Sequence, residues 1–205
     1  MYKKTTLELW KKGMYAKTKI SLFRNRKVLD IGCGDGEDSF NISKIASRVY
    51  AVDIAKNIKW DSYKANNLTL RVANAQKLPF PDNYFNGIYL KDVLHHVDYP
   101  KKVLSEIRRV TKKGSVIILV EGNRYNPIFY IHMTKMKGHE HLTFTVFKKI
   151  IFEKFNNVKF FQFESHYIPI SNHLFFNLIS KMIIFFFNIP LLNRFKSYNM
   201  AIIIK

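Results

Sequence analysis

The segment VLDIGCGDG at positions 28–36 carries the residue types that most directly indicate chemistry. Its start has the apolar character of a buried strand, glycines alternate over the following positions, and a helix-like run begins near Glu37. Glycine permits positive φ at a tight turn and lets a ligand approach the backbone more closely than a Cβ would allow. The segment therefore predicts a strand, a glycine turn and a helix, with a ligand held against residues 32–36.

Acidic side chains surround this turn. Asp30 lies at the strand end and Asp35 lies within the turn, while Glu37 and Asp38 open the predicted helix. A turn that holds a pyrophosphate uses bare N–H groups and the helix dipole, and acids there would repel the phosphates. The G-x-G-x-G spacing also differs from the G-x-G-x-x-G of a dinucleotide site, because residue 37 is Glu. The expected ligand is therefore not a dinucleotide.

VLDIGCGDG resembles the first motif of the class I S-adenosylmethionine-dependent methyltransferases, in the small-molecule, type 11-like branch. Two further segments match in chain order: NAQKLPF at 74–80, and YFNGIYLKDVLHHV at 84–97. The resemblance implies S-adenosylmethionine as cofactor, S-adenosylhomocysteine as product, and direct displacement at the sulfonium methyl. The cofactor-binding residues that it implies are Asp30, Gly32, Cys33, Gly34, Gly36, Asp53, Ile54, Asn74, Ala75, Gln76 and Lys91.

Two of these residues carry specific expectations. Asp53 ends the strand after the glycine turn, where a carboxylate can reach the ribose hydroxyls of an adenosine-bearing cofactor; a solvated, helix-capping role is the alternative. Asn74 stands where related enzymes carry an acid that accepts the adenine amino hydrogen. Its amide oxygen still accepts, through a neutral hydrogen bond of about 0.5 to 1.5 kcal/mol. Adenine binding is expected to be softened rather than lost.

Three residues are catalytic candidates: His95, His96 and Glu121. The resemblance places both histidines beside the methyl-transfer cleft, and the cofactor-binding candidate Lys91 near the methionine end of the cofactor. Each histidine can act as a general base or as a packing residue. Glu121 ends the apolar run SVIILVEG, and strand ends face the ligand crevice in open parallel sheets. Glu121 is therefore a candidate base or substrate-binding residue, with a plain surface acid as the alternative.

Other residues argue against metal, disulfide and secretory functions. His139 and His141 are two apart without a further spaced pair, so no metal site is predicted. Cys33 is the single cysteine, which excludes a disulfide framework and favours a reducing, cytoplasmic setting. The beginning of the chain, MYKKTTLELWKKG, has no long apolar run and no cleavage site for a secretory signal.

The net charge is strongly positive. Thirty-four Lys and Arg against fifteen Asp and Glu give +19, which attracts nucleic acid, anionic lipid or an acidic substrate. The basic residues are scattered, and Lys, Asn, Ile and Phe are frequent along the whole chain. We therefore favour compositional bias, with nucleic acid and peripheral membrane contact as alternatives.

Positions 171–190 invite a transmembrane interpretation. The polar residues fall on one arc of a helix: His173, Asn177, Ser180, Lys181 and Asn188. A lysine at mid-span would also cost about 2.5 to 3.5 kcal/mol at the centre of a bilayer. The pattern favours an amphipathic helix whose wide apolar face meets the sheet together with a greasy substrate, a partner or a membrane interface.

These patterns predict an α/β, Rossmann-like three-layer sandwich of about seven strands, mostly parallel, with an antiparallel terminal hairpin. Residues 158–167 and the final SYNMAIIIK form that hairpin, and the run after Pro100 forms a helix that Gly114 ends. The whole chain, 1–205, is expected to be one methyltransferase domain. It divides into an N-terminal helical lid (1–26), a cofactor-binding core (27–121), and acceptor-side elements with the hairpin (122–205).

The acceptor is expected to be a small or lipid-like molecule, because the match is to the small-molecule branch and the helix at 171–190 is so apolar. No NPPY or DPPY run follows the fourth strand, which argues against N-methylation of bases or glutamine amides. The charge leaves an RNA or protein methyltransferase as one alternative. A catalytically inactive module that binds S-adenosylmethionine is the other.

Overall fold

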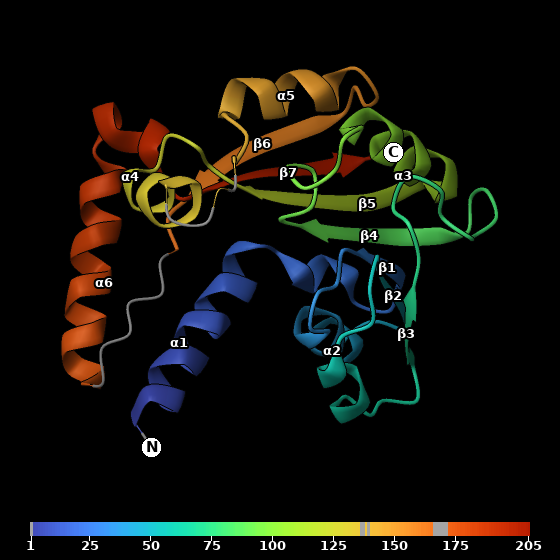
Figure 1. Cartoon of the computed structure of the whole chain (residues 1–205), viewed down its shortest axis with the longest axis horizontal. Helices are drawn as coiled ribbons and strands as arrows, with labels where there is room; N and C mark the ends of the chain where they lie inside the picture. The colour runs from blue at the N-terminus through green and yellow to red at the C-terminus, as the bar shows by residue number, and fades with distance from the viewer. Residues whose placement is uncertain (1, 136–137, 139, 166–171) are drawn as a thin grey trace.

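A single mixed sheet forms the centre of the computed structural model, which describes residues 2–135, 138, 140–165 and 172–205 (Figure 1). The order of its seven strands is β3-β2-β1-β4-β5-β7-β6. β7 is antiparallel to both of its neighbours, and the other pairs are parallel. The strands are β1 (Lys27–Ile31), β2 (Arg48–Asp53), β3 (Leu68–Val72), β4 (Phe85–Lys91), β5 (Thr111–Gly122), β6 (Val158–Phe163) and β7 (Tyr198–Ile204). The predicted fold class, including the antiparallel terminal pair, is confirmed.

Helices cover both faces of the sheet, which gives the three layers (Figure 1). The α-helices are α1 (Tyr2–Lys17), α2 (Glu37–Ser43), α3 (Pro100–Val110), α4 (Pro127–Phe129), α5 (Phe144–Phe152) and α6 (His173–Asn188). The shorter 3₁₀ and π turns are η1 (Ile20–Phe23), η2 (Ile58–Ser62), η3 (Tyr130–Lys135) and η4 (Pro190–Phe195). α3 and α5 contribute to the core on one face, and α1, η1 and α2 to the core on the other.

The central strands are apolar at almost every position because both of their faces are covered. In β5, Ile117 and Leu119 belong to the core under α3 and α5, while Ile118 and Val120 belong to the opposite core. The alternation of strand side chains sends successive residues to opposite faces. The continuous apolar run in the sequence therefore corresponds to two cores that share one sheet.

The predicted end of the helix after Pro100 is wrong. α3 ends at Val110, and β5 begins at Thr111, which pairs with Phe85. Gly114 does not end the helix; it lies within β5 at φ +75°, and its N–H donates to the carbonyl of Lys205. The pairing of Thr111 with β4 competes with a further helical turn, and a register shift follows in that ladder.

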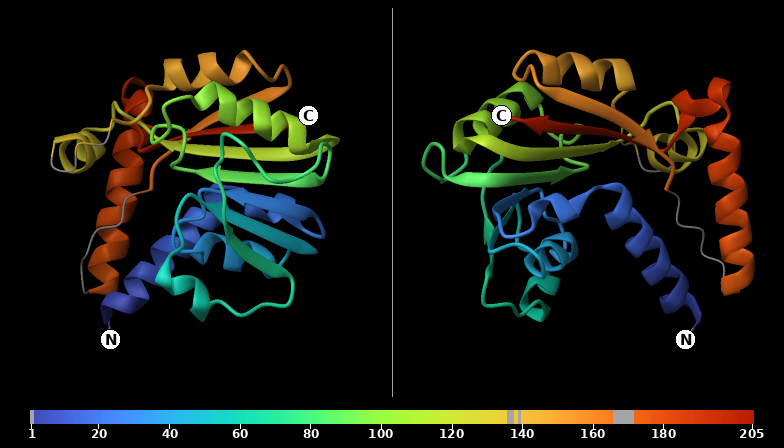
Figure 2. Two further views of the ribbon diagram at one scale, coloured as in Figure 1. Left: turned by 45° about the vertical axis from the view of Figure 1, so that its right-hand side comes forward. Right: turned by 180° about the vertical axis from the view of Figure 1, so that it is seen from behind.

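Two helices extend away from the sheet on the same side of the molecule. Figure 2 shows α1 and α6 descending beside one another, and the two helices are in contact. α6 is connected to β7 through η4, so only its C-terminal end is held close to the sheet (Figure 1). Among the described residues, no helix is long and apolar enough to cross a membrane.

Candidate cofactor and acceptor site

The glycine turn has the geometry that its sequence predicts. Gly32, Gly34 and Gly36 adopt φ values of +71°, +53° and +88° between β1 and α2. The requirement is strictest at the first glycine, because a Cβ on Gly32 would lie 2.1 Å from a methyl carbon of Val93. The Gly32 N–H also donates to the carbonyl of Val52 at 2.8 Å. The turn is therefore held against the neighbouring strand ends and can admit a ligand close to its backbone.

Asp53 lies at the end of β2, beside this turn. Its carboxylate accepts the N–H of Gly34 at 2.7 Å. On the other side, the Trp60 indole N–H donates to the Gly34 carbonyl at 2.8 Å. Parallel pairing of β1 with β2 brings Asp53 to the turn, since the carboxyl ends of neighbouring strands meet at one edge.

One cavity, of about 470 Å³, lies between the glycine turn and the end of β3; we call it the β3 cavity. It contains the predicted cofactor residues Asp53, Ile54, Asn74, Ala75 and Gln76. The Asn74 side-chain oxygen already accepts the N–H of Gln76 at 2.8 Å. A carbonyl oxygen can accept a second hydrogen bond, so Asn74 can still serve as an acceptor for a ligand.

A second cavity, of about 370 Å³, lies between the glycine turn and α1; we call it the α1 cavity. Besides Gly32 and Gly34, its wall contains three predicted cofactor residues: Asp30, Cys33 and Lys91. Gly36 lines neither cavity and lies against Leu70, Trp60 and Tyr63. Gly32, Gly34 and Asp92 line both cavities. The two cavities therefore form one cleft that passes over the glycine turn.

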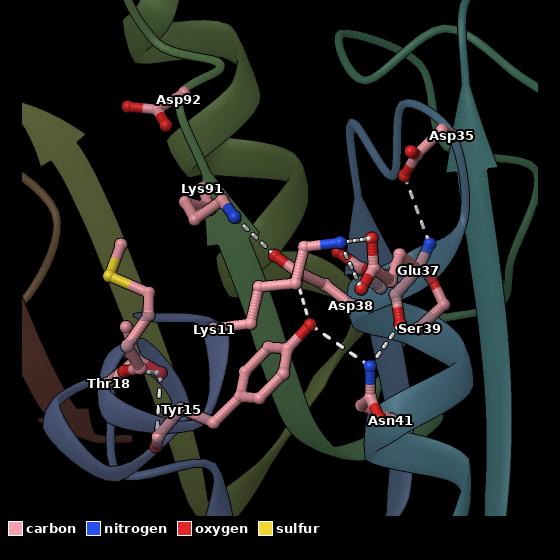
Figure 3. A network of polar contacts seen from close by, with 12 residues as sticks. Lys11, Tyr15, Thr18, Asp35, Glu37, Asp38, Ser39, Asn41, Lys91 and Asp92 are labelled. Atoms are coloured by element: carbon pink, nitrogen blue, oxygen red, sulfur yellow. Dashed lines mark hydrogen bonds and ion pairs between the residues drawn. The ribbon is translucent and has the colours of Figure 1, made fainter. Parts of the chain in front are cut away.

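Acidic residues at the start of α2 hold α1 against this cleft (Figure 3). Lys11 of α1 pairs with Glu37 at 2.5 Å, and the Tyr15 hydroxyl donates to Asp38 at 3.0 Å. Lys91 reaches the same Asp38 carboxylate at 2.6 Å from the end of β4. The acids that the sequence analysis used against a pyrophosphate thus fix one wall of the α1 cavity.

The α1 cavity is electrostatically suited to a cation. Burial raises the pKa of Asp30 to about 7, although the Ser39 hydroxyl donates to this carboxyl at 2.5 Å. Burial alone would lower the pKa of Lys91, but the charges of Asp38 and Asp92 raise it overall. Burial also raises the pKa of the Cys33 thiol, so this cysteine stays protonated and is not a nucleophile.

Glu121 is neither a surface acid nor open to the cleft: it is 0% exposed. Its carboxylate accepts the N–H groups of Val93 at 2.9 Å and Leu94 at 2.7 Å. Its second oxygen lies 2.6 Å from the His95 Nδ1. Since β4 and β5 are parallel neighbours, Glu121 lies beneath the turn that follows β4. The surface-acid alternative is wrong, and the carboxylate orients the turn and its histidine.

The two neighbouring histidines occupy different environments. The His95 side chain is 1% exposed, and its ring lies 4.0 Å from that of His96 and 4.4 Å from that of His141, measured between centroids. Burial would lower the pKa of His95, but the hydrogen bond and charge of Glu121 raise it overall. His96 is exposed and lines the β3 cavity. The Glu121 carboxylate therefore orients the His95 imidazole.

Asp92 is the site residue that sequence reasoning missed. It follows β4 at φ +56°, accepts the N–H of Gly122 at 3.1 Å, and lines both cavities. Burial and the charge of Glu121 raise its pKa to about 6. The sequence contains a signal for this residue, because Asp92 directly follows the β4 strand in the same way that Asp53 ends β2.

Asp92 also lies near two histidines. Ligand atoms of Asp92, His95 and His141 lie within 4.8 Å of one another. The sequence analysis weighed His141 only against His139, which lies outside the described residues. A bridge between Asn123 and Leu142 brings His141 to the end of the sheet, a contact that spacing could not indicate.

A third cavity, of about 260 Å³, lies between α1 and α6; we call it the α1–α6 cavity. Its apolar lining includes Leu9, Phe176, Ile183 and Ile184. Trp10 lines both this cavity and the α1 cavity, so its indole lies between the two spaces. An apolar space therefore adjoins the charged cleft.

Comparison with known proteins agrees with this geometry. The family model described as "Methyltransferase domain" matches residues 29–119. An uncharacterized protein of Methanocaldococcus jannaschii is 34% identical over 75% of this chain and 62% of its own length. The ubiquinone/menaquinone biosynthesis C-methyltransferase UbiE of Neisseria gonorrhoeae is 34% identical over 52% of this chain and 47% of its own length. The chain thus spans about half to two thirds of the length of these relatives.

A solved structure supports the fold over the full chain. An S-adenosylmethionine-dependent methyltransferase from Archaeoglobus fulgidus matches 100% of this chain and 95% of its own, with a TM-score of 0.66 and 20% identity. The fold is that of a Rossmann-like domain, and residues 29–119 match the methyltransferase domain family. The chain is thus similar to the class I S-adenosylmethionine-dependent methyltransferases of the type 11 branch.

Proposed function

We propose that this chain binds S-adenosylmethionine in the cleft formed by the α1 and β3 cavities and transfers its methyl group to a small, lipid-like acceptor. The observation that carries the cofactor assignment is the positive-φ turn from Gly32 to Gly36, with Asp53 bonded to it and a cavity on each side. This arrangement offers an elongated ligand two connected compartments, of which the α1 cavity carries more charged side chains.

The adenosine end is assigned to the β3 cavity. Asp53 would bind the ribose hydroxyls, exchanging its bond to the Gly34 N–H for ligand contacts. Asn74 would accept from the adenine amino group, with Ile54, Ala75 and Gln76 around the ring. The neutral amide of Asn74 gives a hydrogen bond of about 0.5 to 1.5 kcal/mol.

The methionine end is assigned to the α1 cavity. The sulfonium and the ammonium of the cofactor are positive, and the carboxyl groups of Asp30 and Asp92 face this space. Lys91 and Lys11 lie on opposite walls and would exchange their pairing with Asp38 and Glu37 for the cofactor carboxylate. Charge complementarity therefore supports S-adenosylmethionine here and disfavours a pyrophosphate.

The cofactor supplies an activated methyl group, so the protein mainly supplies proximity and alignment. The acceptor nucleophile forms a bond to the methyl carbon while the carbon–sulfur bond breaks, which leaves S-adenosylhomocysteine. For an acceptor that must lose a proton, we assign His96 as the base, since it is exposed and lines the cleft. His95, whose side chain is 1% exposed, is assigned together with Glu121 to positioning the turn after β4.

The lipid-like class of acceptor is supported by the α1–α6 cavity. It is mainly apolar, and Trp10 separates it from the α1 cavity, where the methyl group would be presented. Several relatives are named demethylmenaquinone or ubiquinone/menaquinone methyltransferases, which supports the same class. The +19 charge keeps RNA or protein as the alternative acceptor.

Calorimetry tests the cofactor assignment with S-adenosylmethionine, S-adenosylhomocysteine, NAD and ATP. We expect binding of the first two, and tighter binding of NAD than of S-adenosylhomocysteine would overturn the assignment. Labelled methyl donor is then supplied with lipid extract, RNA or protein. Incorporation into RNA or protein alone would overturn the acceptor class, and cofactor binding without incorporation into any fraction would indicate a binding module.

The α1–α6 cavity is tested separately with Ile184→Asp, which places a charge in its apolar lining. We expect acceptor turnover to fall by at least tenfold while S-adenosylhomocysteine affinity stays within about threefold, because an apolar acceptor would be brought into contact with a charged group. Val146→Asp on exposed α5 is the matched control. Unchanged turnover in a folded Ile184→Asp protein would place the acceptor elsewhere.

A further inference from the structure

α6 differs from a typical surface helix of a water-soluble domain, because many of its apolar side chains face solvent. Its exposed side chains are almost all large and apolar, with exposed fractions of 77% at Leu174, 74% at Phe185 and 62% at Met182. We call this surface the outward face; its members are Leu174, Phe175, Leu178, Lys181, Met182, Phe185 and Phe186, continued by Leu191 of η4. A surface helix normally turns such a stripe toward the core.

Two uncharged polar residues of α6 point away from the outward face. Asn177 and Ser180 are half-buried and line the α1–α6 cavity, on the same side as the buried Phe176 and Phe187. Of the polar stripe predicted from the sequence, Asn177 and Ser180 therefore face the cavity, whereas Lys181 and Asn188 are exposed. Water-exposed apolar surface of this extent marks a site of interaction with a protein, a ligand or a membrane.

The charge of this region selects among those partners. Between positions 165 and 205 the chain contains no Asp or Glu, and its charged residues are Lys181, Arg194, Lys196 and Lys205. Lys181 lies on the outward face, and Arg194 is exposed in η4. Long basic side chains can place their apolar stems beside lipid chains while their charges reach anionic headgroups.

We propose that the outward face of α6 docks on an anionic lipid bilayer, with the helix lying in the plane of the interface. α6 has 16 residues and a lysine near its centre, so it suits an interfacial position rather than a span. The apolar side chains enter the boundary between headgroups and acyl chains, and the basic residues contact the headgroups. η4 continues the contact through Leu191, which is 83% exposed.

A second copy of the chain fits this surface less well. In a symmetric pair the same patch meets itself, so Lys181 of one copy would approach Lys181 of the other. The segment from 165 onward offers no carboxylate to compensate either lysine. Phospholipid headgroups supply that countercharge, and acyl chains cover the remaining face.

The position of this surface also connects it with the acceptor, a point that rests on the proposed function. The α1–α6 cavity adjoins the outward face along α6, because Lys181 belongs to both surfaces. Figure 2 shows α1 and α6 extending together away from the sheet. A docked α6 would hold the mouth of this cavity at the lipid surface, where an amphiphilic acceptor is concentrated.

Vesicle flotation tests the docking without any acceptor. The full chain is mixed with vesicles of phosphatidylcholine alone or with phosphatidylglycerol added, at low and at high salt. We expect flotation with phosphatidylglycerol vesicles, weakened by salt, since both apolar burial and charge contribute. Leu178→Ser with Phe185→Ser should lower the partition coefficient by at least tenfold, and Lys181→Glu should lower it by about tenfold on anionic vesicles.

Ile58→Ser is the matched control, because Ile58 is 88% exposed on η2, away from α6. Its partition coefficient should equal that of the unmodified chain. Equal S-adenosylhomocysteine affinity and equal melting temperature across the variants establish that each is folded and separate this test from that of the methyltransferase assignment.

Three outcomes would overturn the proposal. Flotation that the α6 variants leave unchanged would assign lipid binding to another surface. An absence of flotation, with dimerisation that the same variants abolish, would assign the outward face to a second copy. Release by detergent alone, after resistance to high salt, would indicate an integral anchor.

Discussion

The glycine-turn cleft and the outward face of α6 present opposite chemistry. In the cleft, polar groups are buried and bonded to one another, as with Asp38, which accepts from both Tyr15 and Lys91. On α6, apolar side chains are exposed, as with Phe185. The cleft is built in advance for a small, charged ligand, whereas the α6 face lacks a covering element among the described residues. The two regions therefore call for partners of different chemistry.

α1 links these two regions. It carries Lys11 and Tyr15, which bond to the cleft, and it contacts α6 on its other side. Trp10 lines a cavity on each side of the helix. Variants in the cleft and on the α6 face can consequently be tested separately. A variant in α1 shows whether a change at one region affects the other.

The largest expected difference between the two regions is in how much a leucine-to-alanine substitution lowers the free energy of unfolding. Leu94 is 1% exposed in the turn after β4, and Leu178 is 55% exposed on α6. Leu94→Ala should lower the free energy of unfolding by about 2 to 5 kcal/mol, because it leaves a cavity. Leu178→Ala should change it by less than about 0.5 kcal/mol. Urea unfolding measures both, and an equal loss would mean that the α6 face is covered in solution.

The next largest effect concerns cofactor affinity. Asp53→Ala should weaken S-adenosylhomocysteine binding by about 1.5 to 3 kcal/mol, or roughly 10- to 150-fold, as expected for lost hydrogen bonds to a charged group. Calorimetry measures the loss, and Phe186→Ser on α6 should leave the affinity unchanged. A folded Asp53→Ala protein with full affinity would restrict Asp53 to its bond with the Gly34 N–H.

A pH dependence should distinguish the two regions further. Burial raises the pKa of Asp30 to about 7, so this carboxyl is largely protonated below that pH when no ligand is bound. S-adenosylhomocysteine lacks the sulfonium but keeps the ammonium group, which favours the Asp30 carboxylate. Its binding below pH 7 must therefore release a proton. Affinity for S-adenosylhomocysteine should rise by up to about tenfold per pH unit toward pH 7 and then level off.

Asp30→Asn is the variant for that measurement, since it removes the titrating group at similar volume. Its affinity profile should be flat over the same range. A profile that still rises with pH in Asp30→Asn would assign the titration to Asp92, whose pKa burial raises to about 6.

The smallest effect concerns the attachment of α1. Tyr15→Phe removes the hydroxyl that donates to Asp38 at 3.0 Å and accepts from Asn41 at 3.0 Å. Stability should fall by about 0.5 to 1.5 kcal/mol, and hydrogen exchange in α1 should quicken. Tyr99→Phe, at a 58% exposed position, is the control. If vesicle binding also weakens in Tyr15→Phe, the cleft and the α6 face communicate through α1.

Local sequence was sufficient for the strand, the glycine turn and Asp53. These features depend on residues within one strand-turn-helix unit or on the spacing between two consecutive strands, so the sequence alone predicts them. The same holds for the order of elements and for the antiparallel terminal pair. The division into lid, core and acceptor side stays a prediction, as do the assigned roles of the site residues.

The end of α3 could not be predicted from local sequence. The helical pattern runs to Gly114, yet the chain leaves the helix at Val110 because Thr111 pairs with β4. The competing partner belongs to another strand, which local helical periodicity does not include.

Tertiary structure alone decided the roles of Glu121 and His141 and the orientation of α6. Glu121 meets its partners because β4 and β5 are adjacent in the sheet, and His141 reaches His95 through a long connection. For α6, the sequence determined that two unlike faces exist. Which of them is covered depends on where β7, η4 and α1 hold the helix, because an amphipathic pattern fixes the faces of a helix but not its neighbours.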